Sequence, residues 1–345
     1  LTPYVRVRIL LPLPAGVPKG APAFCFCLNG GKMKRTAAIL IALTLLCLPL
    51  AGCGAEAAEE TDGISVVATV FAPYDFARQL VGDRGEVTLL LPPGSEAHSY
   101  EPSPKDIIEI QNCDVFIYVG GVSDAWVTDV LESVGDGVRT VTLMDCVELL
   151  EEEHVEGMEI DEHEHDDGEV EYDEHVWTSP RNAKLICEKI AAALSEADPE
   201  GEAEYSAALE SYCAELDELD AAFTDVVANG VRNTIVFGDR FPLLYFAKAY
   251  GLEYYAAWPG CADEAEPSAA TVAFLIDKVN EENIPVVFHI ELSNEDMADT
   301  ICEATGAEKL LFSACHNVTR AQFEEGVTYL DLMWQNVDAL KEALS

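Results

Sequence analysis

Apolar residues in the first half of the chain fall into short runs separated by stretches with helical spacing. The runs are rich in β-branched residues, which is typical of buried strands, and they lie at residues 64–70, 87–91, 115–119 and 140–143. A helix is predicted to start at Ser103, because Pro104 follows in the first turn and Asp106 stands three residues after the cap. Strands that alternate with helices predict a parallel sheet and an α/β fold.

The second half repeats this alternation. Strands are predicted at residues 234–237, 254–258, 286–290 and 309–312, and helices at residues 243–250, 269–280, 294–305 and 329–344. Residues 202–229 lie between the halves, contain no Gly or Pro, and place apolar side chains at steps of four and three. A helix of this length is about 40 Å long. It predicts two lobes joined by one long helix, and a coiled-coil dimer is the alternative interpretation.

We divide the chain accordingly into an N-terminal lobe at residues 63–180, a linking helical region at 181–229 and a C-terminal lobe at 230–345. We expect a monomer whose ligand site lies between the lobes. One segment of the first lobe, residues 151–174, breaks the pattern. It holds 14 Asp and Glu, no Lys or Arg, and the three histidines His154, His163 and His165. Self-repulsion predicts that this loop is unfolded and solvated.

The N-terminal region has the features of an export signal. Met33, Lys34 and Arg35 precede an apolar run at residues 37–50, which is too short for a membrane span of about 20 residues. We interpret residues 1–32 as untranslated upstream sequence, with a genuine extension as the alternative, and residues 33–52 as a lipoprotein signal peptide.

Residues 50–53 resemble a bacterial lipobox, in which the cysteine, here Cys53, carries the lipid. The alternative is ordinary secretory cleavage beside an incidental cysteine. Residues 53–62 are small and acidic and are expected to be a tether. The interpretation places the protein outside the cytoplasm, anchored to the bacterial cell membrane through Cys53.

The charge balance bears on the partners. The chain has 63 acidic and 20 basic residues, and removal of residues 1–52 leaves 14 basic residues and all the acidic ones. Nucleic-acid binding is disfavoured, because phosphate contacts need Lys and Arg, whereas an acidic surface suits cations. Seven cysteines follow Cys53. Disulfides are permitted outside the cytoplasm, and an odd number of cysteines leaves at least one thiol free. The absence of a CxxC pair disfavours a cysteine-based zinc site.

Four histidines outside the acidic loop lie in loops or near strand ends, at His98, His175, His289 and His316. Each one taken alone fits a surface or core histidine. Together they are informative, because ligands of open α/β sheets bind beyond the carboxyl ends of the strands. A site between two lobes draws on loops from both.

The order of these segments resembles the zinc and manganese solute-binding proteins of ABC importers. The segments that carry the resemblance are residues 94–102, around His98, and residues 173–180, around His175. The resemblance implies two α/β lobes joined by a backbone helix, with one metal ion between them bound by His98 and His175. It implies an ABC permease and its ATPase as partners. An acidic, histidine-rich loop before the second ligand is typical of the zinc members, and we expect it to capture metal.

The third ligand position departs from the family. Counting back from the aromatic stretch at Tyr245 puts Arg240 where the family has His or Glu, and a guanidinium does not bind a cation. Asp239 replaces that ligand if the loop turns it inward; otherwise Arg240 pairs with a site carboxylate.

The family's last ligand follows the final core strand, and His316 occupies that place. Asp239, Glu291 or water is the candidate fourth ligand. His289 and Glu291 share a face in an ideal strand, and Glu96, Arg240 and His289 are candidates for supporting the ligands from behind.

Three imidazoles with at most one carboxylate suit zinc, whereas manganese favours more oxygen ligands. Manganese therefore remains the alternative metal. A zinc-dependent hydrolase is the rival from another class, but the chain contains neither HExxH nor GxSxG. An adhesin that uses the same fold for cell attachment is a second rival. The sequence favours a metal-binding transport protein that is not an enzyme.

Overall fold

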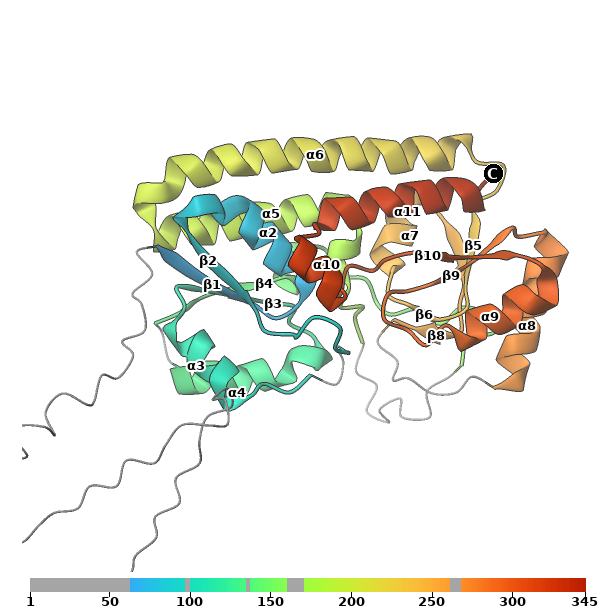
Figure 1. Ribbon diagram of the computed structural model, residues 1–345, viewed down its shortest axis with the longest axis horizontal. Helices are drawn as coiled ribbons and strands as arrows, with labels where there is room; N and C mark the ends of the chain where they lie inside the picture. Colours follow the sequence, from blue (N-terminus) through green and yellow to red (C-terminus); the bar gives the residue numbers. More distant parts are fainter. Residues whose placement is uncertain (1–62, 97–99, 135–136, 160–170, 261–267) are drawn as a thin grey trace, which may run out of the picture. The chain divides into compact units, whose positions relative to one another are not determined.

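The computed structural model describes residues 63–96, 100–134, 137–159, 171–260 and 268–345. These residues form two α/β lobes, each built on a four-stranded parallel sheet (Figure 1). The strand order of the N-terminal sheet is β2-β1-β3-β4, and its strands are β1 (Ile64–Ala68), β2 (Gly85–Leu89), β3 (Val115–Tyr118) and β4 (Arg139–Thr142). The predicted α/β fold with parallel sheets is confirmed.

Helices cover both faces of the N-terminal sheet. The helices are α2 (Phe71–Val81), α3 (Pro104–Asn112), α4 (Ala125–Val134) and α5 (Pro180–Ala197). Val66 belongs to the cluster that α2 and α5 complete, while its neighbour Val67 belongs to the cluster of α3 and α4. Successive strand residues point to opposite faces, which is why the adjacent residues Val66 and Val67 are both apolar. The predicted cap of α3 is present, because Ser103 Oγ accepts from the backbone N–H of Asp106, whose carboxylate accepts from that of Ser103.

The C-terminal sheet has the order β10-β9-β5-β7, and a short pair of parallel strands, β6 and β8, lies beside it. Its strands are β5 (Thr234–Phe237), β7 (Glu253–Tyr255), β9 (Val286–His289) and β10 (Glu308–Leu311), and the pair is β6 (Arg240–Phe241) with β8 (Trp258–Pro259). The helices of this half are α7 (Leu244–Tyr250), α8 (Ala269–Glu282), α9 (Asp296–Thr305), α10 (Arg320–Glu325) and α11 (Tyr329–Ala343). Val236 and Val287 pack against α8 and α9, and Ile235 and Phe288 face the large cluster on the other side.

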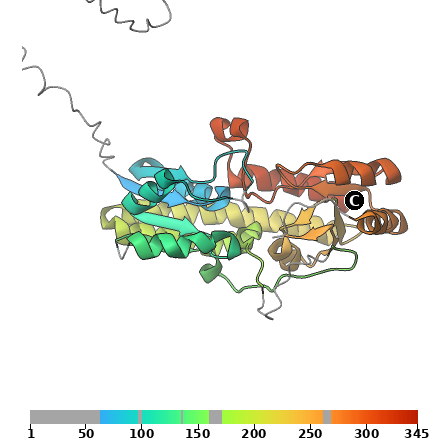
Figure 2. The ribbon, with the colours of Figure 1, turned by 90° about the horizontal axis from the view of Figure 1, so that it is seen from below.

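Helix α6 (Glu202–Asn229) has the predicted bounds and lies alongside elements of both lobes (Figures 1 and 2). Its stripe packs against α2, α5, α7 and α11 of the same chain. The buried stripe residues are Tyr205, Tyr212, Leu216, Leu219 and Phe223. Because the chain itself covers this stripe, the helix needs no coiled-coil partner.

Two strand predictions in the C-terminal lobe were too long. The strand predicted at residues 254–258 is divided between β7 and β8, and the one predicted at 286–290 ends at His289. Leu292 has a left-handed backbone with φ of 61°, so the chain turns directly after the strand. His289 and Glu291 therefore do not share a strand face, as the sequence had suggested.

The prediction that residues 151–174 are unfolded is wrong for the described part of the segment. Glu151 bridges Tyr172 in antiparallel fashion, and Glu159 N–H donates to Ala257 O at 2.8 Å in the C-terminal lobe. Met158 is buried, so an apolar anchor and backbone pairing outweigh the charge repulsion. Residues 160–170, with His163 and His165, lie outside the described residues.

Two further acids of the segment are buried rather than solvated. The exposed fractions of Asp173 and Glu174 are 1% and 4%. Glu174 Oε1 accepts from the backbone N–H of Ser123 at 3.1 Å. A Cβ atom at Gly121 would come within 2.1 Å of that oxygen, so glycine leaves the room that the carboxylate needs.

Six cysteines of the described residues are free thiols: Cys113, Cys146, Cys187, Cys213, Cys302 and Cys315. Cys53 and Cys261 lie outside the described part of the chain. Among the described helices, none combines the length and the apolar character that crossing a membrane requires.

Asp124 gives the N-terminal lobe a testable pH dependence. It accepts from the backbone N–H groups of Val119 and Gly120 after β3, at 2.6 and 3.2 Å. Burial nevertheless raises its pKa from 3.8 to about 6. Because the folded value lies above the unfolded one, the stability that the protonated group contributes is complete below about pH 4 and is lost as the pH rises through about 6.

Asp124→Asn keeps an acceptor oxygen but does not titrate. Its free energy of unfolding relative to the wild type should therefore increase by about 2–3 kcal/mol between about pH 4 and pH 7. Urea unfolding of both proteins across this range measures the difference. A difference that does not change with pH would contradict the assignment.

Candidate metal site

His175 lies at the end of the acidic segment, directly before the 3-10 turn Val176–Thr178 that leads into α5. Its side chain is fully buried. Asp173 Oδ1 accepts from the His175 backbone N–H at 2.8 Å and lies 3.3 Å from ring Nδ1. Since a carboxylate only accepts, this contact places the ring hydrogen on Nδ1, which is the tautomer in which Nε2 can bind a metal ion.

His316 belongs to the loop between β10 and α10, which we name the 313–318 loop. Although it leaves the C-terminal sheet, this loop is hydrogen-bonded to the N-terminal lobe. His316 O accepts from Phe71 N–H at 3.0 Å, and Asn317 Nδ2 donates to Pro92 O at 3.0 Å and to Ser95 O at 2.9 Å. The N-terminal lobe thus fixes the position of a histidine that the C-terminal lobe supplies.

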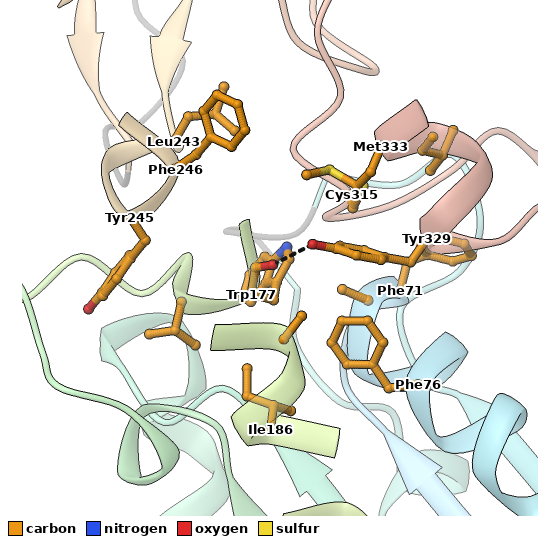
Figure 3. Packing of buried hydrophobic residues seen from close by; sticks show 14 of the residues in the cluster. Phe71, Phe76, Trp177, Ile186, Leu243, Tyr245, Phe246, Cys315, Tyr329 and Met333 are labelled. Atoms are coloured by element: carbon orange, nitrogen blue, oxygen red, sulfur yellow. Dashed lines mark hydrogen bonds between the residues drawn. The ribbon is translucent and has the colours of Figure 1, made fainter. Parts of the chain in front are cut away.

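Trp177 joins the two histidines. Its buried indole N–H donates to Ala314 O at 2.8 Å, and its carbonyl accepts from the Tyr329 hydroxyl at 2.9 Å (Figure 3). The ring centroids of His175 and His316 lie 5.1 Å apart with an interplanar angle of 89°. Residues that are 141 positions apart by their numbers therefore present imidazoles to one place.

The spacing of the two rings suits a shared metal ion. A zinc–nitrogen bond of about 2.1 Å puts each ring centroid about 3.2 Å from the ion, and tetrahedral bonds then separate the centroids by about 5 Å. Both imidazoles line one cavity, together with Glu96, Arg240 and Glu291. Within the described residues, no three His, Cys, Asp or Glu side chains are grouped closely enough to hold a metal ion. His98, the further ligand implied by the resemblance, lies outside them.

Glu291 braces the 313–318 loop. Its Oε2 accepts from Ala314 N–H at 2.7 Å and its Oε1 accepts from His316 N–H at 2.8 Å. Burial raises the pKa of Glu291, and these N–H donors oppose the increase. The carboxylate lines the cavity, but both oxygens already hold the backbone that carries His316.

Asp239 and His289 are directed to backbone rather than to the cavity. Asp239 accepts from Arg240 N–H at 2.8 Å and from Ile290 N–H at 3.1 Å, and His289 Nδ1 lies 3.1 Å from Ile290 O. Neither belongs to the cavity lining. Their contacts fix the end of β9, and both carboxylate oxygens of Asp239 accept from this backbone.

Arg240 pairs with a carboxylate of the other lobe. Its two terminal nitrogens donate to the two oxygens of Glu96, each at 3.3 Å. The expected pairing with a site carboxylate is thus present, and its partner is Glu96. His154, the remaining described histidine, is exposed in the acidic segment.

Sequence reasoning missed the residues that position the histidines, namely Asp173, Trp177 and Asn317. Only Asp173 had a local signal, since an acid two residues before a ligand can reach that ligand's backbone. Cys315 is adjacent to His316, but it does not line the cavity, and its buried Sγ accepts from Ser313 Oγ at 3.7 Å.

Comparison with known proteins identifies similar chains. Residues 66–343 match the family model for the zinc-uptake complex component A, periplasmic. The high-affinity zinc uptake system protein ZnuA of Bacillus subtilis is 32% identical over 306 residues, which cover 86% of this chain and 94% of that protein.

A second similar protein is the zinc-binding lipoprotein AdcA of Streptococcus pneumoniae, which is 30% identical over 90% of this chain. The match spans 61% of the length of AdcA. The Zn(II)-bound structure of its ZnuA-like domain has a TM-score of 0.68 at 28% identity and covers 82% of this chain and 99% of that one. The laminin-binding protein Lmb of Streptococcus agalactiae, described as bifunctional with adhesin and metal transporting activity, has a TM-score of 0.68 at 25% identity, covering 82% of this chain and 100% of that one.

The role of Glu291 as a brace can be tested without metal. Glu291→Gln places an amide NH₂ against one of the two backbone donors, so one hydrogen bond is lost in the buried loop. The free energy of unfolding of the metal-free protein should fall by about 1–3 kcal/mol. Glu295→Gln is the matched control, because Glu295 pairs with Lys309 at the surface and should change stability by less than about 1 kcal/mol. Equal stability of the two variants in urea unfolding would contradict the brace.

Proposed function

The chain belongs to the zinc-uptake complex component A family, and we propose that it captures zinc outside the cytoplasm and delivers it to an ABC importer. The observation that carries the proposal is the pair of imidazoles from opposite lobes, His175 and His316, with ring centroids 5.1 Å apart. His98 is the third proposed ligand, and water completes the tetrahedron. The ion is the cargo of this site.

The lining carboxylates support a binding function over a hydrolytic one. A catalytic zinc site needs an open position for water and a general base. Glu291 holds the 313–318 loop and Glu96 pairs with Arg240, so each candidate base is engaged elsewhere. The similar chains are named for zinc uptake and zinc binding. We propose a transport binding protein without enzymatic activity.

The site chemistry favours zinc as the metal. Imidazole ligands suit a borderline-soft ion with tetrahedral preference, whereas manganese prefers six oxygen-rich ligands. The alternative of a manganese-binding member is therefore less consistent with the residues that line the cavity.

The location follows from the family and from the N-terminal sequence. We propose that Cys53 is lipidated and that residues 53–62 tether the fold to the outer face of the bacterial membrane, beside an ABC permease and its ATPase. A lipid anchor leaves the lobes in solvent. It also raises the local concentration of the carrier at its permease.

Attachment to host surfaces is a second candidate function, and it rests on the similarity to Lmb. The two functions differ in their readouts. Growth at limiting zinc measures transport, and adhesion of cells to laminin measures attachment. Both can be followed in one deletion strain that is complemented with site variants.

The ligand set can be tested by single substitutions. Each of His98→Ala, His175→Ala and His316→Ala should weaken zinc binding by more than the roughly 10–100-fold that loss of an outer-shell partner costs. Competition titration with a chromogenic chelator gives the Kd. His289→Ala, outside the cavity lining, is the comparison and should weaken zinc binding less than each of the three ligand variants does. Because ligating imidazoles must be neutral, affinity should also fall as the pH is lowered. Wild-type affinity in all three variants would refute the site.

The acidic loop should capture metal rather than hold it. Residues 160–170 should be replaced by Gly and Ser at equal length, because Met158 and Glu159 anchor the preceding arm to the fold. Calorimetric titration should then show one tight zinc site and the loss of weaker ones, since ordering a chain segment around an ion carries an entropic cost. Disappearance of the tight site would place the loop within the primary site.

A further inference from the structure

Arg240 brings a permanent cation to the wall of a cavity that we assign to a metal cation. It lies in β6, its exposed fraction is 6%, and both the guanidinium and Glu96 line the cavity beside His175 and His316. A buried charge needs a compensating partner. Glu96 compensates it across the two lobes, with two N–O contacts of 3.3 Å in a forked arrangement.

The pair changes which donor atoms the cavity offers. A free carboxylate is an oxygen ligand that binds mono- or bidentately, whereas a guanidinium has only N–H donors and never ligates a cation. Both oxygens of Glu96 face Arg240, so the pair withholds its carboxylate from an ion. Glu291, the other lining carboxylate named above, already accepts from Ala314 and His316.

We propose that Arg240 determines the metal selectivity of this site by holding Glu96 out of the coordination sphere. The inference rests on the proposed function. With Glu96 restrained, the cavity presents imidazoles and few oxygen ligands. This set of donor atoms suits four-coordinate zinc and lacks the oxygen ligands that manganese prefers. The pair is neutral as a whole, so the guanidinium does not repel the cargo while Glu96 remains beside it.

Arg240→Met is the central variant. Met fills much of the volume of the Arg stem without a charge, and the Glu96 side chain is 35% exposed, so the substitution leaves no fully buried lone carboxylate. Without the guanidinium, the Glu96 carboxylate is no longer restrained by Arg240 and can approach the ion as an oxygen ligand. The ratio of the manganese Kd to the zinc Kd should fall by about tenfold or more.

Glu96→Gln and the double variant complete a cycle that separates charge from ligation. Glu96→Gln removes one negative charge from beside the guanidinium, so zinc binding should weaken by about tenfold, and the selectivity ratio should not fall. The double variant has neither the cation nor the freed carboxylate. Its ratio should return to within about threefold of the wild-type value.

Arg84→Met is the matched control. Arg84 also forms a partly buried ion pair, with Asp198 at 2.7 Å, but it directly precedes β2 and therefore lies at the amino edge of the sheet, away from the carboxyl ends that carry the site. Its selectivity ratio should equal that of the wild type. Thermal unfolding of the wild type and the four variants, all without metal, reports structural effects separately.

Kd values for Zn²⁺ and Mn²⁺ from competition titration decide the outcome. A fall of the ratio in Arg240→Met that the double variant reverses supports the proposal. An unchanged ratio in a folded Arg240→Met protein overturns it. If Arg240→Met does not fold, the zinc affinity of Glu96→Gln tests the proposal instead. Zinc binding as tight as in the wild type would then show that the Arg240–Glu96 pair does not act on the ion, and would overturn the proposal. Absence of tight zinc binding in the wild type would instead refute the proposed function itself.

Discussion

The rest of the site depends on the 313–318 loop, which leaves one lobe and is hydrogen-bonded to the other. Asn336 in α11 holds its first residue through two hydrogen bonds of 2.8 Å to the backbone of Ser313. Trp177 and Phe71 bind it from the N-terminal lobe, and Glu291 binds it from the end of β9. Cys315 has a left-handed backbone with φ of 56°, which costs about 1–3 kcal/mol for a residue with a side chain. Such a conformation persists only because the surrounding contacts determine it, and it is the conformation that presents His316 to the cavity.

The same contacts pre-organise the site for its cargo. The Tyr329 hydroxyl donates to Trp177 O (Figure 3), and the Tyr329 backbone N–H donates to buried Asp75 at 2.7 Å. The start of α11, helix α2 and the turn after His175 thus share one buried, hydrogen-bonded network. The two imidazoles are held at their spacing before any ion arrives, so little binding free energy is spent on ordering the ligands. This arrangement suits a carrier that must bind tightly from a dilute pool.

The elements of the fold could be read from the sequence where apolar periodicity was strong, as in α6 and β5, whose bounds were predicted correctly. The strand at residues 254–258 was not divided correctly, because an apolar run does not reveal where the backbone turns. The acidic segment was misjudged because composition outweighed Met158, a single apolar anchor whose effect depends on a partner surface far along the chain. In the site, the resemblance supplied His175 and His316. It could not supply Glu96 as the partner of Arg240, because that pair joins residues 144 positions apart and depends on how the lobes meet.

The strong negative charge of the chain and the cation at its site have different physical consequences. An acidic surface raises the local concentration of every divalent cation, since long-range attraction depends on charge and not on the identity of the metal. Discrimination among ions must therefore arise where the ion loses its water and meets fixed ligands. In this chain that place contains two buried or half-buried imidazoles and a carboxylate held by a guanidinium. Carboxylates that attract cations are abundant outside the cavity, whereas those at the cavity are engaged by N–H donors. Because these two sets of carboxylates are separate, the acidic surface can attract divalent cations quickly and without selectivity. The donor atoms of the cavity then select the ion.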